Sequence, residues 1–250
     1  MAEMNPTKSY RFKIYDNGNW LKKESEICIE KTFNIFVNIR KIASLLCMPL
    51  DLKELAVGFL ITEGIINDIN IIKSIEIKGI NIIVYSDKFN AKIDYWMEIR
   101  SSGCIDVKKS WENLIKPFDI KINIDPEVIF KAQQILQESG KIWKKTGGTH
   151  IAGIFSLKNG KLLEYSEDVG RHNAIDKVVG KIYLKKIDPS SCFLVTTGRQ
   201  SVGMVGKVAR AGIPMIVSNT APLSQGIDLA RKLNMKLICF SREPIFNLYC

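Results

Sequence analysis

Short runs of apolar, β-branched residues separated by tight turns predict strands over the first part of the chain. Asn17-Gly18 and Gly79 are the turn signals, each between such runs. A helical pattern interrupts the strands, because apolar residues recur with helical spacing from Leu52 to Leu60. We expect Asp51 to cap this helix and Gly64 to end it. The strands predicted here cover residues 27–29, 33–39, 75–77 and 82–85.

After residue 124 the pattern changes to helices that alternate with strands. Asp125-Pro126 predicts a helix start, because a capping aspartate precedes a proline at the first helical position. Asn159-Gly160 predicts a hairpin between the runs 151–158 and 161–165. A strand-helix-strand-helix-strand order follows and predicts a parallel sheet. In this region we predict strands at 192–196, 213–217 and 236–240, and helices near 174–182, 201–211 and 225–233.

These elements predict an α/β protein in two parts. A chain of 250 residues suits one large domain or two small ones, and 46% hydrophobic residues are enough for a sizeable core. We expect a smaller, strand-rich α+β part over residues 1–120 and an α/β domain with a mainly parallel part over residues 121–250. The boundary is predicted within residues 115–125.

The chain lacks the sequence features of a secreted, membrane-spanning or zinc-bound protein. No apolar run is long enough to cross a bilayer, and residues 1–8 lack the apolar stretch of a secretory signal. We therefore expect a cytoplasmic protein without membrane partners. The six cysteines form no C-x-x-C pair and there are only two histidines, so we expect neither a disulfide framework nor a structural metal.

A formal net charge of +10 leaves two interpretations open. Lysines are spread over most of the chain, so the charge can simply be that of a solvated surface. It can also indicate a polyanionic ligand or partner. No helix-turn-helix, zinc finger or RNA-binding signature is visible, so nucleic acid is the weaker choice. A small molecule rich in phosphate explains the charge equally well.

Polar segments follow three of the predicted strands. In an open α/β sheet, ligands bind beyond the carboxyl ends of the strands. Two of the segments open helices, whose free N–H groups favour phosphate, and arginine supplies forked donors for phosphate oxygens. Each polar residue alone is better explained as a helix cap, but three converging segments with two arginines favour a ligand site. The candidates are Thr197, Gly198, Arg199, Ser218, Asn219, Phe240, Ser241, Arg242 and Glu243.

The segment from Glu167 to Ala174 also opens a predicted helix. Asp168 is a candidate cap, and Gly170 permits close approach of the backbone to a ligand. Arg171 and His172 follow it. His172 can act as an acid–base group or contact a ligand, but a packing role explains it as well. The same two interpretations apply to His150.

Cys104 stands in a polar, glycine-containing setting unlike that of the cysteines in apolar runs. Arg100, Lys108 and Lys109 would favour its thiolate. A thiolate can attack a sulfane sulfur, hold it as a persulfide and pass it on. By itself, a lone loop cysteine is more often incidental than catalytic.

Four segments taken together resemble the FdhD family of formate dehydrogenase accessory sulfurtransferases. The resemblance covers most of the chain from about Ile27 onward, and it is specific because unusual segments occur in the right order. The segments are Leu55–Gly64, Thr146–His150, Glu167–Ala174 and Thr197–Pro222.

The resemblance implies a function and a set of partners. Such proteins take sulfur from a cysteine desulfurase and deliver it to a molybdenum cofactor carrying guanine dinucleotides, Mo-bis(molybdopterin guanine dinucleotide), before that cofactor enters formate dehydrogenase. By resemblance, Cys104 is the persulfide-carrying residue and 121–250 has a cytidine-deaminase-like, three-layer fold. A homodimer is also implied. The cofactor-binding segment would be Phe240, Ser241, Arg242, Glu243, Pro244 and Ile245.

The chain departs from the family in one respect. Many members carry two cysteines in a Cys-Gly-x-Cys-Gly loop, whereas Ser101-Ser102-Gly103-Cys104-Ile105-Asp106 has one. A relay between two loop cysteines is therefore excluded, while one thiolate suffices for one sulfur. Deaminase chemistry is not expected, because neither an H-x-E nor a P-C-x-x-C segment occurs.

Two other functions stay open. The chain could be a non-catalytic chaperone that binds the molybdenum cofactor and docks on formate dehydrogenase apo-enzyme, which the missing second cysteine favours. A nucleic-acid binder, suggested only by the charge, would show salt-sensitive binding to arbitrary DNA.

Overall fold

The computed structural model describes residues 5–87, 89, 99–100 and 115–250. No helix in these ranges is long and apolar enough to cross a membrane. The strands are β1 (Thr7–Asp16), β2 (Asn19–Cys28), β3 (Lys31–Val37), β4 (Arg40–Cys47), β5 (Ile72–Lys78), β6 (Asn81–Ser86), β7 (Ile99–Arg100), β8 (His150–Ser156), β9 (Leu162–Asp168), β10 (Cys192–Thr196), β11 (Met215–Ser218), β12 (Lys236–Arg242) and β13 (Ile245–Leu248). The helices are α1 (Leu52–Thr62), α2 (Pro126–Ser139), α3 (Lys141–Thr146), α4 (Arg171–Leu184), α5 (Val202–Arg210) and α6 (Ser224–Lys232), with 3-10 turns at Ile69–Ile71 and Pro189–Ser191.

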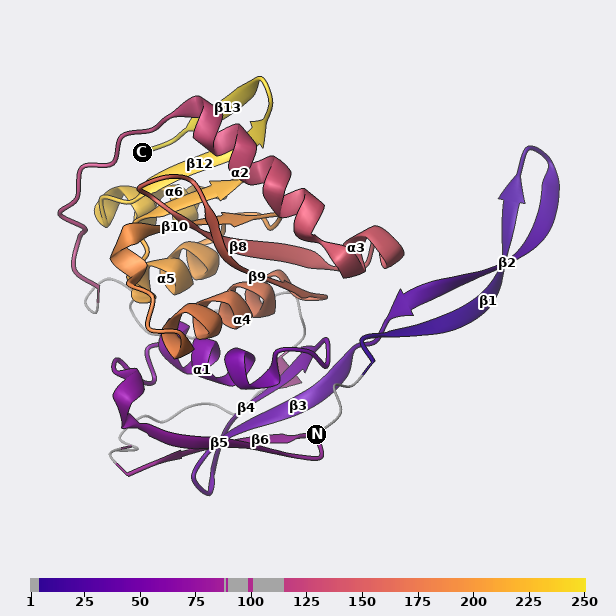
Figure 1. Cartoon of the computed structure of the whole chain (residues 1–250), viewed down its shortest axis with the longest axis horizontal. Helices are drawn as coiled ribbons and strands as arrows, with labels where there is room; N and C mark the ends of the chain where they lie inside the picture. The colour runs from indigo at the N-terminus through magenta and orange to yellow at the C-terminus, as the bar shows by residue number, and fades with distance from the viewer. Residues whose placement is uncertain (1–4, 88, 90–98, 101–114) are drawn as a thin grey trace.

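The strands form three sheets (Figure 1). β1 and β2 form a separate two-stranded hairpin, and the second sheet has the order β5-β6-β3-β4-β7. The third has the order β13-β12-β11-β10-β8-β9. Its members β10, β11 and β12 are parallel, as predicted, but β8, β9 and β13 pair antiparallel. The sheet is therefore mixed, with two parallel and three antiparallel pairings. The α/β class expected from the sequence is confirmed, but the sheet is less parallel than expected.

Helices cover both faces of the six-stranded sheet, because its strands are apolar on both sides. Along β8, Ile151 and Phe155 pack with α2, while Ala152 and Ile154 belong to the core on the other face. Figure 1 shows α2 on one side of this sheet and α4 and α5 on the other. Such continuous apolar strands are what burial on two faces requires.

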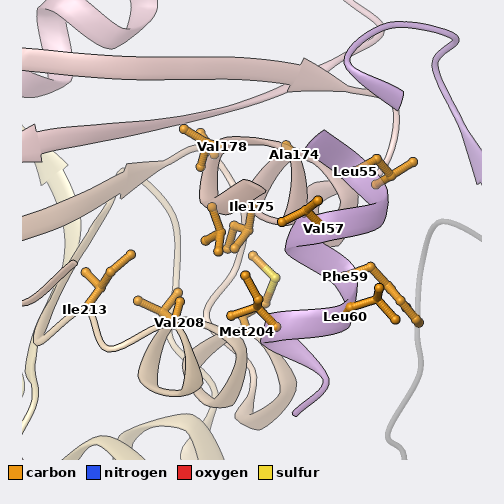
Figure 2. Close-up of a cluster of buried hydrophobic side chains, with 14 of the residues drawn as sticks. Leu55, Val57, Phe59, Leu60, Ala174, Ile175, Val178, Met204, Val208 and Ile213 are labelled. Carbon is orange, nitrogen blue, oxygen red and sulfur yellow. The ribbon is translucent and has the colours of Figure 1, made fainter. Parts of the chain in front are cut away.

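Helix α1 joins the two larger sheets into one core. Its residues Leu52 to Thr62 are nearly all buried, and they pack against α4 and α5 on one side and the five-stranded sheet on the other. Figure 2 shows Val57 and Leu60 of α1 among Ile175 of α4 and Met204 of α5. The contact between α1 and α4 runs through glycine on both helices, because a Cβ at Gly58 or Gly180 would overlap backbone atoms of the opposite helix.

A buried ionic group lies between the same three helices. The Lys207 ammonium of α5 lies 2.9 Å from an Asp176 carboxylate oxygen and 2.8 Å from Glu63. It also donates to the Thr62 hydroxyl, which in turn donates to Asp176 at 2.6 Å. Burial alone would lower the pKa of Lys207, but the paired carboxylates raise it, so the lysine stays charged.

The sequence did not predict β1, β4, β7, β13 or α3, and the start of α1 differs from the prediction. β4 was not predicted, because the chain turns at Asn38 in a left-handed conformation (φ 54°) and returns as a second strand instead of continuing to residue 39. Asp51 precedes α1 but does not cap it with its side chain. Its carboxylate instead accepts from Ser166 and pairs with Lys181 at 2.7 Å.

The glycine contact gives a stability prediction. Gly58→Ala should lower the free energy of unfolding by about 3 kcal/mol or more, because the helices must separate to admit one methyl group. The control is Gly79→Ala, where no atom lies within 4 Å of the added Cβ. Its positive φ should cost only about 1 kcal/mol. Urea unfolding followed by circular dichroism measures the free energy of unfolding of both variants. Equal losses in the two variants would show that the close contact of α1 with α4 does not restrict residue size at position 58.

Candidate functional site

The strand ends that the sequence singled out lie at one edge of the six-stranded sheet. Ser218, at the end of β11, donates from its hydroxyl to the Gly198 carbonyl at 2.8 Å. The Phe240 amide donates to the Thr220 carbonyl at 3.1 Å, which ties β12 to the loop after β11. All three predicted segments are thus joined by hydrogen bonds, because parallel strands end at the same edge.

The start of β8 and the start of α4 lie at this edge too. The Thr197 hydroxyl is 3.2 Å from His150 Nδ1 and accepts from the Ile151 amide. A Cβ at Gly198 would come within 2.9 Å of the Arg171 Cβ, so glycine is needed where the loop passes α4. His172 follows Arg171 in the first turn of α4. The edge therefore gathers residues from five separate segments.

Several polar atoms at this edge are buried and have no hydrogen-bond partner among the residues that the structure describes. They are Gln200 Oε1, Asn219 Oδ1 and Ser241 Oγ. Such atoms are costly unless water or a ligand satisfies them. Gln200 was not predicted as a site residue. Its amide nitrogen donates to the Gly198 carbonyl at 2.6 Å. Three such atoms on three adjacent segments make this edge a candidate place for a polar ligand or for bound water.

Charged and aromatic side chains border these atoms on the outside. Arg199 and Arg242 are exposed, and so is Phe240. Phe240 has φ 52°, which is unusual for a bulky residue and often marks a functional position. Glu243 and Pro244 form the exposed turn between β12 and β13, and the exposed Ile245 begins β13. The edge thus combines exposed guanidinium groups with an exposed aromatic ring.

Both histidines are held neutral. Burial, followed by the charge of Arg171, lowers the pKa of His150. Burial, followed by the charges of Lys207 and Arg171, lowers the pKa of His172 to about 3. At neutral pH these imidazoles can exchange hydrogen bonds but add no positive charge. Attraction for an anion therefore falls to the arginines.

Asp168 and Glu167 support the site instead of lining it. Asp168 was predicted to cap α4, but the cap residue is Gly170. The Gly170 amide donates to the Asp168 carboxylate at 2.8 Å. Asp168 pairs with the fully buried Lys177 at 2.6 Å. Glu167 accepts from the amides of Ile142 and Trp143, which begins α3. The sequence signal for the buried pair of Asp168 and Lys177 is a lysine within the apolar stretch of α4. This signal was not used in the prediction.

The candidate sulfur carrier Cys104 lies outside the described residues. Among the described cysteines, burial raises the pKa of Cys47 and of Cys239 to about 12. Such thiols are almost fully protonated at neutral pH and are poor nucleophiles. Within the described ranges, no three His, Cys, Asp or Glu side chains are placed to hold a metal ion.

Comparisons with known proteins agree on one family. The sequence model of the FdhD/NarQ family matches residues 28–250. The sulfur carrier protein FdhD of Thermoplasma volcanium is 36% identical, covering 99% of this chain and 96% of its own. The sulfur carrier protein FdhD of Bacillus licheniformis is 32% identical, and the match covers 98% of this chain and 95% of that protein. A crystal structure of a formate dehydrogenase accessory protein from Desulfotalea psychrophila has a TM-score of 0.84 and 30% identity, and covers 98% of this chain and 97% of its own.

The lowered histidine pKa predicts how stability depends on pH. His172 has a lower pKa in the folded protein than in the unfolded chain. Its contribution to the free energy of unfolding is therefore complete above about pH 6.5 and falls as the pH drops toward 3. His172→Gln removes the titration. Between pH 7.5 and 5 the wild type should lose more unfolding free energy than the variant, by up to about 1.4 kcal/mol per pH unit below 6.5. Parallel curves from urea titrations at several pH values would contradict a buried, neutral His172.

Proposed function

This chain belongs to the FdhD/NarQ family, and we propose on that basis that it is a sulfur carrier in the maturation of formate dehydrogenase. Relatives named sulfur carrier protein FdhD match nearly the whole chain. The observation that carries the proposal beyond the family is the cluster of orphan polar atoms at the sheet edge, bordered by two arginines. A carrier needs a place for its acceptor, and this edge can provide one.

We propose that the edge holds the guanine dinucleotide part of Mo-bis(molybdopterin guanine dinucleotide), the substrate that receives the sulfur. Arg199 and Arg242 suit pyrophosphate oxygens, and the exposed Phe240 ring suits stacking on a base. The orphan atoms of Asn219 and Ser241 suit the polar edge of guanine. The remaining proposed binding residues are Thr197, Gly198, Ser218, Arg171, His172, Glu243, Pro244 and Ile245.

In the proposed sulfur step, Cys104 accepts sulfur from a cysteine desulfurase. The Cys104 thiolate attacks the outer sulfur of the donor persulfide. A new S–S bond forms at Cys104, the donor S–S bond breaks, and the donor cysteine leaves as a thiolate. No net oxidation occurs. The raised pKa values of Cys47 and Cys239 favour Cys104 over these cysteines. The chain would thereby be a sulfurtransferase.

Three further proposals follow from family membership. The fold of residues 121–250, with helices on both faces of a mixed sheet, is compatible with a cytidine-deaminase-like architecture. The chain works in the cytoplasm with the formate dehydrogenase apo-enzyme, and it works as a homodimer.

A second candidate function, the cofactor chaperone without sulfur chemistry, is favoured by the single cysteine in the Cys104 loop.

The sulfur step is tested by the mass of the intact protein. After incubation with cysteine and a cysteine desulfurase, the wild type should gain about 32 Da, and a reductant should remove it. Cys104→Ser should gain nothing, while Cys250→Ser, which removes a half-buried thiol, should gain the same mass as the wild type. Sulfur retained on Cys104→Ser would point to another cysteine. No gain on the wild type would favour the chaperone.

The nucleotide site is tested with GDP as the probe. Isothermal titration of Arg242→Ala should show affinity at least about tenfold weaker than the wild type, since a charge-assisted hydrogen bond contributes about 1.5–3 kcal/mol. The control is Arg11→Ala, which removes another exposed arginine from the distant β1–β2 hairpin. Equal affinities in all three proteins would exclude Arg242 from the site.

A further inference from the structure

His150 lies at the candidate site but has no role in the proposed function. It begins β8, where Asp168 at the end of β9 pairs with it on one side and the end of β10 lies on the other. The Thr197 hydroxyl, just after β10, lies 3.2 Å from the Nδ1 atom of His150. The imidazole is partly buried, so the contacts around it determine what each ring nitrogen can do.

The Thr197 hydroxyl determines which nitrogen of the neutral His150 ring carries the proton. The hydroxyl oxygen accepts from the Ile151 amide at 3.1 Å, and the single hydroxyl proton then needs an acceptor. Among the described residues, the acceptor within reach of this proton is His150 Nδ1. Because Nδ1 accepts, the ring proton is on Nε2. His150 therefore presents an N–H donor on the side of the ring away from Thr197.

Two arginines lie near this donor. Burial is the largest cause of the lowered pKa of His150, and the charges of Arg171 and Arg199 lower this pKa further. Arg171 occupies the first turn of α4, and Arg199 follows β10. Three separate segments thus bring one neutral N–H donor and two guanidinium groups to the same place, which suits an anion.

The carboxylate that acts on the His150 ring already has its charge balanced. Asp168 raises the pKa of His150, against the effect of the arginines. Its carboxylate is fully buried, pairs with Lys177 at 2.6 Å and accepts from the Gly170 amide and the Asn173 side chain. The negative charge of Asp168 is therefore held by partners in the core, so it opposes an anion beside His150 only weakly.

We propose that His150, Arg171 and Arg199 form an anion subsite that takes the terminal phosphate of the nucleotide, while the guanine lies at β12. His150 donates from Nε2 to a phosphate oxygen, and Thr197 is the positioning residue that keeps the proton on Nε2. The inference rests on the proposed nucleotide site and deepens it, because it gives the ligand a direction along the sheet edge.

The strand order determines this direction. In the order β12-β11-β10-β8, the strand that carries Phe240 is three strands away from the strand that begins with His150. Neighbouring strands are about 4.8 Å apart, so the two ends of the site are roughly 14 Å apart. An extended nucleoside diphosphate has a comparable length. Phe240 offers an exposed ring for a base, and Arg242 on the same strand can reach the first phosphate, so the terminal phosphate lies toward β8.

Two nucleotides that differ by one phosphate test the subsite. In isothermal titration, His150→Ala should weaken GDP binding at least about tenfold, because a hydrogen bond to a charged group is lost. The same variant should bind GMP within about twofold of the wild type, because GMP has no second phosphate to reach β8. Retained GMP binding also shows that the variant is folded. Equal weakening of GDP and GMP binding would overturn the inference.

Inorganic pyrophosphate separates this inference from the proposed nucleotide site. If the wild type binds pyrophosphate through His150 and binds GDP no more tightly, the subsite stands and the nucleotide proposal fails. If Arg242→Ala weakens GDP binding and His150→Ala does not, the nucleotide proposal stands and the subsite fails. A wild type that binds neither GDP nor pyrophosphate contradicts both.

The positioning role of Thr197 is tested by the tautomer of His150. The chain has only two histidines, so nitrogen–proton correlation spectra of the imidazoles resolve both, and His172→Gln assigns them. The proton should be on Nε2 of His150 in the wild type and in Thr197→Ser, which keeps the hydroxyl. In Thr197→Val, which keeps the shape and loses the hydroxyl, a population with the proton on Nδ1 should appear and GDP binding should weaken. The same tautomer and GDP affinity in all three proteins would exclude this role for Thr197.

Discussion

The close contact of α1 with α4 determines how the two halves of this protein fit together. Gly58 and Gly180 bring the helix backbones into direct contact, which no larger residue permits. The Lys207, Asp176 and Glu63 charges are buried at the junction of α1, α4 and α5. Buried ions are costly unless paired, so the pairing also selects one relative position of these helices. A packing constraint and an electrostatic one thus coincide at the same junction.

The position of the candidate site depends on that junction, because α4 begins at the site and its middle is buried in the junction. Arg171 and His172 occupy its first turn, and Asp176 and Gly180 its middle. The buried Lys177 adds a second connection, since it bonds to the Met48 carbonyl between β4 and α1 as well as to Asp168. Displacement of α1 would therefore move the start of α4. The cost of burial has a further effect at the site, where it keeps His172 neutral.

Most of the elements could be predicted from the sequence, because turn signals and apolar periodicity are local. The Asn17-Gly18, Gly79 and Asn159-Gly160 turns and the Asp125 cap are where the pattern placed them. β4 was missed because its turn depends on Asn38 in a left-handed conformation, for which asparagine alone is a weak signal. The roles of Asp51, Asp168 and Glu167 could not be predicted, since their partners lie on distant elements.

The candidate site was predictable for a different reason, namely that topology brings strand ends together whatever the side chains. Thr197, Ser218 and Phe240 meet because their strands are parallel neighbours. The same reasoning could not find the exposed apolar face of the β1–β2 hairpin. Tyr10, Phe12 and Ile14 alternate with Arg11 and Lys13 in the sequence, yet such alternation normally indicates a strand buried by its own chain. Only the three-dimensional structure shows that, among the described residues, nothing packs over the face that carries Tyr10 and Phe12.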